Sequence, residues 1–268
     1  MAPPRTPKKR PRTYDAAKIR TAVLTQFGHV REAAAELTPQ QLDAPTRLDG
    51  WTVRDLLAHT SMALGAVDRF LALPEPAKAE KAALDWPFAT AANAPGIADR
   101  SREIAAEHPD VTALLAATEQ RFAEILAATA DTRVLPVQAG PMTLADYLVT
   151  RTVELVVHTD DLNDAVPGLD VPLDRQALAA CTRLLADALA TKAPGGSTEV
   201  RIPPFAVVQC VEGPRHTRGT PPNVVETDPL TWLRLATGRT SWKAALDDAL
   251  VSASGERADL EALLPIMA

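Results

Sequence analysis

The feature that most constrains the fold is a change of sequence pattern at the segment APGG (193–196). Before this segment, apolar residues recur at helical spacing over long stretches that are rich in alanine. After it, short runs of β-branched residues alternate with turn residues. Long runs with a period near 3.6 predict helices, and short β-branched runs between turn signals predict strands. We therefore expect an α+β protein, with a helical bundle over residues 14–194 and a small α+β domain over residues 197–268.

The expected elements follow from these patterns and from two helix-start signals. TVRD (52–55) and TLAD (143–146) both have the Thr-x-x-Asp spacing of a capping box, so each is expected to begin a helix. Residues 74–95 contain several prolines and are expected to form a surface loop. Helices are expected at 14–37, 52–73, 97–130 with a break near 108–109, 143–163, 173–192, 229–238, from Ser241 onwards and at 257–267. Strands are expected at 199–203, 205–212, 223–227 and 250–255.

Charge and composition exclude several classes of protein. Residues 1–13 carry five basic and no acidic residues, so the remainder has a net charge of −11 in a chain of −6. We expect these residues to be a solvated, disordered tail, with contact to an acidic surface as the alternative, and the acidic body disfavours nucleic-acid binding. No apolar run reaches the roughly 18 to 20 residues that span a bilayer, and no secretory signal is evident, so a cytoplasmic protein is expected. Cys181 and Cys210 lie among aliphatic residues and are expected in the core, without a disulfide framework or a nucleophilic role.

The segment VELVVH (153–158) places two polar residues in an apolar run. Glu154 and His158 are four residues apart and therefore share one helix face. His59 lies about two turns into the helix that begins at Thr52, and a bundle can bring it to the same point. Two imidazoles and a carboxylate suit a divalent metal with an open coordination position. Taken alone, the Glu–His pair is more typical of a solvated helix face, and His59 of a core histidine bonded to a carbonyl.

Two phrases, LDGWTVRDLLAHTS (48–61) and RTVELVVHTDDL (151–162), resemble the mycothiol-dependent maleylpyruvate isomerase family of DinB-like metalloenzymes. The first phrase contains the family's pattern G-W-T-V-x-D-L-x-x-H, and the second contains its pattern E-x-x-x-H-x-x-D. The resemblance implies a DinB-like four-helix bundle. It also implies that His59, Glu154 and His158 are the ligands of a divalent metal, usually Zn²⁺.

Residues 197–268 resemble the small sterol-carrier-like domain that follows the bundle in this family. The resemblance implies an enzyme with mycothiol, the low-molecular-weight thiol of actinobacteria, as cosubstrate. A thiolate formed at the metal would add to a small, electrophilic and acidic substrate. Bond rotation and release of the thiolate would make the enzyme an isomerase, and retention of the adduct would make it an S-transferase. A monomer or a homodimer is expected.

Two other functions remain open at this point. The same three ligands would activate water in a metal-dependent hydrolase. A non-catalytic, sterol-carrier-like protein that binds an apolar ligand would need only a structural metal or none. The open ligand set disfavours this second alternative, because structural zinc sites are normally closed by four protein ligands.

Further residues near the expected metal are also candidates. Asp55 is expected to cap a helix, with a hydrogen bond to a ligating histidine as the alternative. Asp161 is expected to be a charge near a helix end, or else such a partner itself. Arg151 is expected on the surface, with pairing to Glu154 or contact with the cosubstrate or an anionic substrate as alternatives.

The small domain contributes candidate substrate anchors. Arg215, His216 and Arg218 lie in one loop rich in glycine and proline. They are expected either to hold carboxylates or to form a solvated hairpin tip. Arg239 follows a glycine that is expected to end a helix. Its side chain is expected either to reach the bundle and anchor substrate or to be a charge at that helix end.

Overall fold

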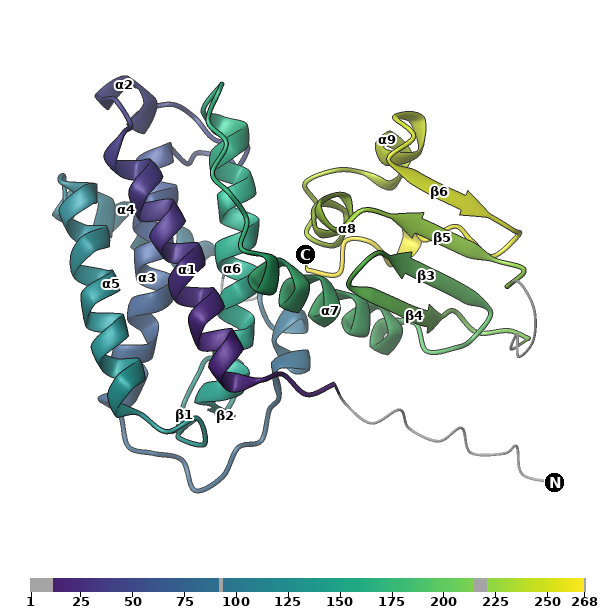
Figure 1. Ribbon diagram of the computed structural model, residues 1–268, viewed down its shortest axis with the longest axis horizontal. Helices are drawn as coiled ribbons and strands as arrows, with labels where there is room; N and C mark the ends of the chain where they lie inside the picture. The colour runs from purple at the N-terminus through teal and green to yellow at the C-terminus, as the bar shows by residue number, and fades with distance from the viewer. Residues whose placement is uncertain (1–11, 92–93, 215–220, 268) are drawn as a thin grey trace.

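The computed structural model describes residues 12–91, 94–214 and 221–267 of the chain. It confirms the expected α+β class, because a helical bundle is followed by a small domain built on a four-stranded sheet (Figure 1). In the part of the chain that is described, no helix is long and apolar enough to cross a bilayer.

The bundle is built from long amphipathic helices, and its described elements are α1 (Ala16–Ala35), α2 (Pro39–Leu42), α3 (Val53–Leu71), α4 (Ala94–Glu107), α5 (Val111–Ala128) and α6 (Leu144–Ala165). α1, α6, α3 and α5 follow one another around a shared apolar core, each in contact with the next. This arrangement is the expected four-helix bundle. α4 packs against α3 and thereby contributes side chains next to the interior face of that helix.

The first residues of α3 and α6 determine which later residues of each helix face the interior of the bundle. Thr52 Oγ1 accepts a hydrogen bond from Asp55 N at 3.2 Å, and Asp55 Oδ2 accepts one from Thr52 N at 2.9 Å, so the expected capping box begins α3. At α6, Thr143 Oγ1 accepts from Asp146 N at 3.1 Å. These caps fix where each helix begins, and they therefore fix which residues face the interior two to four turns later.

The second part of the described chain holds α7 (Arg175–Lys192), α8 (Pro229–Ala236) and α9 (Trp242–Asp247), with strands β3 (Thr198–Ile202), β4 (Ala206–Cys210), β5 (Val224–Thr227) and β6 (Val251–Ser254). The strands form a sheet in the order β4-β3-β5-β6, in which β3 and β5 are parallel and the two outer pairs are antiparallel. α7 contacts α1 and α6 of the bundle as well as β4 and α8 of the small domain. The domain boundary expected between residues 194 and 197 stays a prediction.

The prediction of a helix over residues 257–267 is wrong. In its place the structure has the short 3-10 helix η3 (Glu261–Leu263), and Leu260 and Ile266 on either side of it are buried. Pro265 accounts for the difference, because it has no backbone N–H to donate and disfavours a helical conformation of the preceding residue. The segment therefore buries its apolar side chains as an irregular chain rather than as a helix.

The loop and hairpin regions differ in smaller ways from the expected elements. The connection expected at residues 74–95 contains the 3-10 helix η1 (Ala83–Phe88) and the start of α4. A hairpin of β1 (Val134–Leu135) and β2 (Met142–Thr143) precedes α6 and was not expected. Strands of two residues are too short to leave a periodic pattern.

Expectations for the cysteines and for the basic tail can also be compared with the structure. Cys181 and Cys210 are both buried and free, as expected. Of the tail at residues 1–13, only Arg12 and Thr13 are described, and Arg12 Nε lies 2.9 Å from Asp187 Oδ2 of α7. The expectation of disorder falls on residues that lie outside the described part of the chain.

Ion pairs join the bundle to the small domain at the C-terminal half of α6. The side chain of Asp160 is 3% exposed, and its Oδ1 lies 2.6 Å from Arg234 Nη2 of α8. Arg47, which precedes α3, contacts the same carboxylate and also Asp161, with 2.6 Å between Arg47 Nε and Asp161 Oδ1. Because a buried carboxylate is costly without partners, these contacts tie the position of α8 to that of α6.

Replacing this buried carboxylate is expected to destabilise the protein. Asp160→Ala removes charge-assisted contacts with two arginines, and we expect the free energy of unfolding to fall by about 2 kcal/mol. Urea denaturation followed by circular dichroism measures the change. The matched control is Asp43→Ala, which removes an exposed carboxylate that contacts Arg54 and is expected to leave the midpoint unchanged. Equal midpoints for Asp160→Ala and wild type would contradict a structural role for this contact.

Candidate metal centre

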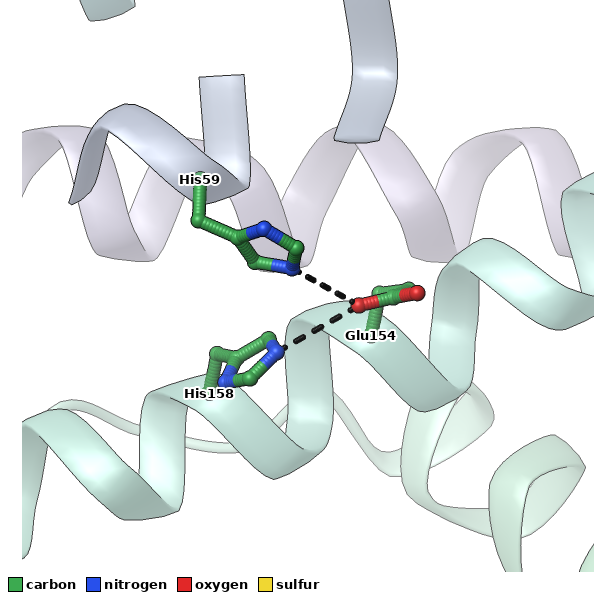
Figure 2. A group of neighbouring side chains, drawn as sticks. All are labelled: His59, Glu154 and His158. Atoms are coloured by element: carbon green, nitrogen blue, oxygen red, sulfur yellow. Dashed lines mark hydrogen bonds and ion pairs between the residues drawn. The ribbon is translucent and has the colours of Figure 1, made fainter. Parts of the chain in front are cut away.

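Three side chains from α3 and α6 point toward one another inside the bundle (Figure 2). The Nε2 atoms of His59 and His158 lie 3.1 and 3.3 Å from the same oxygen, Glu154 Oε2. One ligand-type atom from each residue lies within 4.8 Å of the others. The structure thus brings together the three residues singled out from the sequence.

The outer nitrogen of each histidine has a partner that fixes the hydrogen on that nitrogen. His158 Nδ1 lies 2.9 Å from Asp161 Oδ2, which accepts a hydrogen bond. His59 Nδ1 lies 3.3 Å from Ser101 Oγ of α4. The Ser101 hydroxyl donates to the Ile97 carbonyl at 2.8 Å, so it can only accept from His59. In the neutral imidazoles, each Nε2 therefore presents a lone pair to the interior.

The donor set fits a divalent cation. Two Nε2 lone pairs and the Glu154 carboxylate oxygen face one another with no hydrogen fixed between them. Such an arrangement is repulsive unless a proton or a cation lies among the three atoms. Two imidazoles and one carboxylate match the ligands of catalytic metal sites, and the carboxylate and hydroxyl behind the rings match the hydrogen-bond partners that orient such ligands.

The electrostatics of the group favour the metal-binding forms of Glu154 and His59, but not that of His158. Burial alone would raise the pKa of Glu154, but Arg151 and the two histidines hold it well below its ordinary value. Burial lowers the pKa of His59, which favours the neutral ring. Burial also acts to lower the pKa of His158, but Asp161 and Glu154 outweigh it, and the pKa is raised. A proton on His158 is therefore the species with which a cation would compete.

Arg151 is buried, and the expectation that it lies on the surface is wrong. It is 4% exposed, and its Nη2 lies 3.5 Å from Glu154 Oε1. Its guanidinium also lies 4.4 Å from the centre of the Tyr147 ring. The reason is its position three residues before Glu154, which puts both side chains on the inward face of α6. A role for Arg151 in contacting a cosubstrate stays a prediction.

The two aspartates that flank the histidines have different roles. Asp55 caps α3, as expected. Asp161 is not a charge exposed near a helix end, because it is fully buried and contacts His158. Burial acts to raise the pKa of Asp161, but His158 and Arg239 together lower it strongly. Asp161 is therefore an ionised partner that orients the His158 ring.

Arg239 reaches the bundle, which is the first of the two alternatives that the sequence left open for it. Its Nη2 lies 2.9 Å from Asp161 Oδ2, so a residue of the small domain touches the carboxylate behind His158. Arg215, His216 and Arg218 lie outside the described residues, and their anchoring role stays a prediction.

Two side chains of the centre were missed by the sequence analysis. Ser101 lies on α4, forty-two residues from His59, and no motif links the two positions. Arg47 contacts Asp161 from the loop before α3. Both contacts depend on how distant segments pack, and a lone serine or arginine in a sequence carries no signal of such a partner.

The three residues of the centre border a cavity of about 990 Å³. Its wall is formed by α3, α6, η1, the first half of α4, residues 137–139 and parts of the small domain. The candidate metal centre therefore opens onto a space of the size typical of small-molecule sites. Apolar side chains make up much of the wall, and its charged members are Asp49, His59, Arg69, Arg100, Arg151, Glu154, His158 and Arg239.

Comparisons with known proteins agree with this geometry. Residues 23–163 match the family described as the mycothiol maleylpyruvate isomerase N-terminal domain, and residues 174–266 match the family described as bacterial SCP ortholog. The crystal structure of the mycothiol-dependent maleylpyruvate isomerase is similar with a TM-score of 0.59 and 15% identity, over 92% of this chain and 95% of that one. A crystal structure of a histidine-to-alanine mutant of that isomerase gives a TM-score of 0.58 and 14% identity over the same shares. No curated protein sequence matches the chain significantly.

The solved structures are too distant in sequence to show more than a shared fold. The family match at residues 23–163 is stronger, because it covers more than half of the chain and contains His59, Glu154 and His158. The chain therefore belongs to the family of the mycothiol maleylpyruvate isomerase N-terminal domain, joined here to a bacterial SCP-like domain.

Proposed function

We propose that this chain is a metal-dependent enzyme that uses mycothiol to act on a small, electrophilic and acidic substrate. The observation that carries the proposal is the convergence of His59, Glu154 and His158 on one wall of a large cavity. Membership of a family named after mycothiol maleylpyruvate isomerases supports the choice of thiol.

The three converging residues would hold the metal, which we assign as Zn²⁺ because an open set of imidazole and carboxylate ligands is typical of catalytic zinc. The bound cation would supply one chemical effect, a lower pKa for an added thiol. Glu154, kept anionic by Arg151, contributes negative charge to the centre. Asp161 holds the His158 ring so that Nε2 faces inward.

The protein's own cysteines are unsuited to provide the thiol. Cys181 is fully buried in α7, and burial raises its pKa. Burial raises the pKa of Cys210 to about 11. Neither residue is part of the cavity wall. The reactive thiol must therefore enter from solution, as a mycothiol cosubstrate would.

The arginines around the cavity suit an acidic substrate. Arg239 lies on the wall beside the metal centre, where its remaining donors can hold a carboxylate. We assign the same task to Arg215 and Arg218, for which the sequence predicts a loop and which lie outside the described residues. Arg151 borders the cavity but contacts Glu154, so its effect on a bound cosubstrate would be electrostatic.

Two reaction outcomes begin from the same attack. The thiolate sulfur of mycothiol forms a bond to one carbon of an activated double bond, and the π electrons move onto the conjugated carbonyl. If the carbon–carbon single bond rotates and the thiolate is expelled, the double bond returns with trans geometry and the reaction is an isomerisation. If a proton is taken up instead, the thioether is the product and the reaction is an S-transfer.

The metal assignment predicts a change in metal content. Protein purified without a metal-affinity tag is expected to contain about one zinc per chain, and His158→Ala is expected to contain far less, because one of three ligands is lost. Plasma mass spectrometry measures the content, and circular dichroism checks folding. The matched control is His108→Ala, which removes an exposed histidine and is expected to keep the metal. Equal metal in both variants, or none in the wild type, would contradict the assignment.

The thiol assignment predicts metal-dependent binding of mycothiol. In a calorimeter, mycothiol is expected to bind the metal-loaded protein and to lose most of its affinity after chelation, because the sulfur needs the cation. S-methyl mycothiol is the matched control, since it has the same sugar groups and no ionisable thiol. Binding of both compounds with equal affinity would contradict a role for the sulfur. Metal without any mycothiol binding would favour a hydrolase, and absence of metal would favour a carrier of apolar ligands.

A further inference from the structure

The cavity runs along a strip between α3 and α6, with the metal centre at one end. On α6, Glu154 and Tyr147 are seven residues apart, about two turns, and both line the cavity. On α3, His59 and Phe70 also line it, and the Phe70 ring lies 5.7 Å from the Tyr147 ring. Contact between His59 and Glu154 at one end, and between Phe70 and Tyr147 at the other, shows that the two helices run antiparallel along the strip.

Arg69 lies at the end of this strip that is remote from the metal centre. It follows His59 by ten residues on α3, which places the two backbone positions about 15 Å apart along the helix axis. On α3, the lining side chains between them are apolar, namely Met62, Ala63 and Ala66, and α6 contributes Arg151 to the same stretch. A ligand that touches both ends can therefore lay an apolar body along α3 and place a polar group at its outer end.

Arg69 differs from the other arginines of the cavity wall in its partners. Arg151 contacts Glu154, and Arg239 contacts Asp161. Arg100 contacts two glutamates of its own helix, Glu103 and Glu107. Among the described residues, no carboxylate or other hydrogen-bond acceptor contacts the guanidinium of Arg69. The side chain of Arg69 is exposed, so its donors face water and are available to an anion that enters the cavity.

The surroundings of Arg69 also favour an added anion. Partial desolvation lowers the pKa of this otherwise exposed side chain; Tyr147 opposes that effect, and Arg100 and Arg151 add to it. Repulsion among like charges around one cavity is costly, and an anionic ligand would offset it.

We propose that Arg69 is the anion-binding end of the substrate site and selects substrates that carry a carboxylate on an apolar body, with the reactive carbons at the metal end. Only the placement of the reactive carbons at the metal end rests on the proposed function. A single guanidinium with all its donors free matches one carboxylate through two parallel hydrogen bonds. The apolar strip supplies affinity for the body of the ligand, and Arg69 supplies the preference for the charge.

A matched pair of ligands and a matched pair of variants test the proposal. Phenylhexanoate and its neutral amide have the same apolar body and differ in charge. Their affinities for the full-length protein are measured by calorimetry, before and after chelation of metal, for wild type, Arg69→Gln, Arg69→Lys and Arg102→Gln. Arg102 is an exposed arginine of α4 that pairs with Asp99 and does not line the cavity, so its variant controls for the loss of one positive charge.

The wild type is expected to prefer phenylhexanoate over the amide. Arg69→Gln is expected to weaken phenylhexanoate binding about tenfold and leave amide binding unchanged, because one charge-assisted pair is lost. Arg69→Lys is expected to lose less affinity for phenylhexanoate, since lysine keeps the positive charge but lacks the planar guanidinium. Arg102→Gln should behave as wild type.

Four results would overturn the proposal. They are no preference for the carboxylate in the wild type, unchanged phenylhexanoate binding in Arg69→Gln, an equal loss for both ligands, or an equal loss in Arg102→Gln. The measurement after chelation separates this site from the metal centre. A protein that holds no metal would fail the proposed function, and the effect of Arg69→Gln on the chelated protein would still decide whether the anion site exists.

Discussion

The constraint on which this structure depends is the meeting of three electron-rich atoms inside a helical bundle. His59 Nε2, His158 Nε2 and Glu154 Oε2 face one another, and the outer nitrogens of both rings are already committed to other acceptors. Such an interior needs either a proton on His158 or a cation among the three atoms, because buried polar atoms otherwise lack complementary partners. A cation would satisfy all three atoms at once.

The surroundings of this centre connect it to the rest of the molecule. Asp161 contacts His158 on one side and Arg47 and Arg239 on the other. The neighbouring Asp160 contacts Arg234 of α8. The small domain is therefore attached at the same turn of α6 that orients His158. Arg239 of the small domain also forms part of the cavity wall. The SCP-like domain therefore contributes to the same cavity as the helical bundle.

The sequence predicts those parts of this structure that depend on local patterns. The Thr-x-x-Asp signals at Thr52 and Thr143 predict where α3 and α6 begin, and the family phrases identify the three converging residues. The prediction of a helix over residues 257–267 is wrong because Pro265 interrupts a pattern that otherwise has helical spacing.

Contacts between distant segments leave no such pattern. Ser101 touches His59 across forty-two residues, and Arg47 touches Asp161 across one hundred and fourteen. The burial of Arg151 likewise depends on packing against aromatic side chains, and the free guanidinium of Arg69 depends on which acceptors the fold leaves out of reach. These features are visible only when the helices are in place.

X-ray absorption at the zinc edge reports which atoms bind the metal. For the purified protein, we expect a shell of nitrogen and oxygen atoms at about 2.0 to 2.1 Å and no sulfur. After addition of mycothiol, we expect one sulfur at about 2.3 Å. A shell that contains sulfur before mycothiol is added, or one that gains none afterwards, would contradict the claim that His59, Glu154 and His158 hold a metal that binds the thiol.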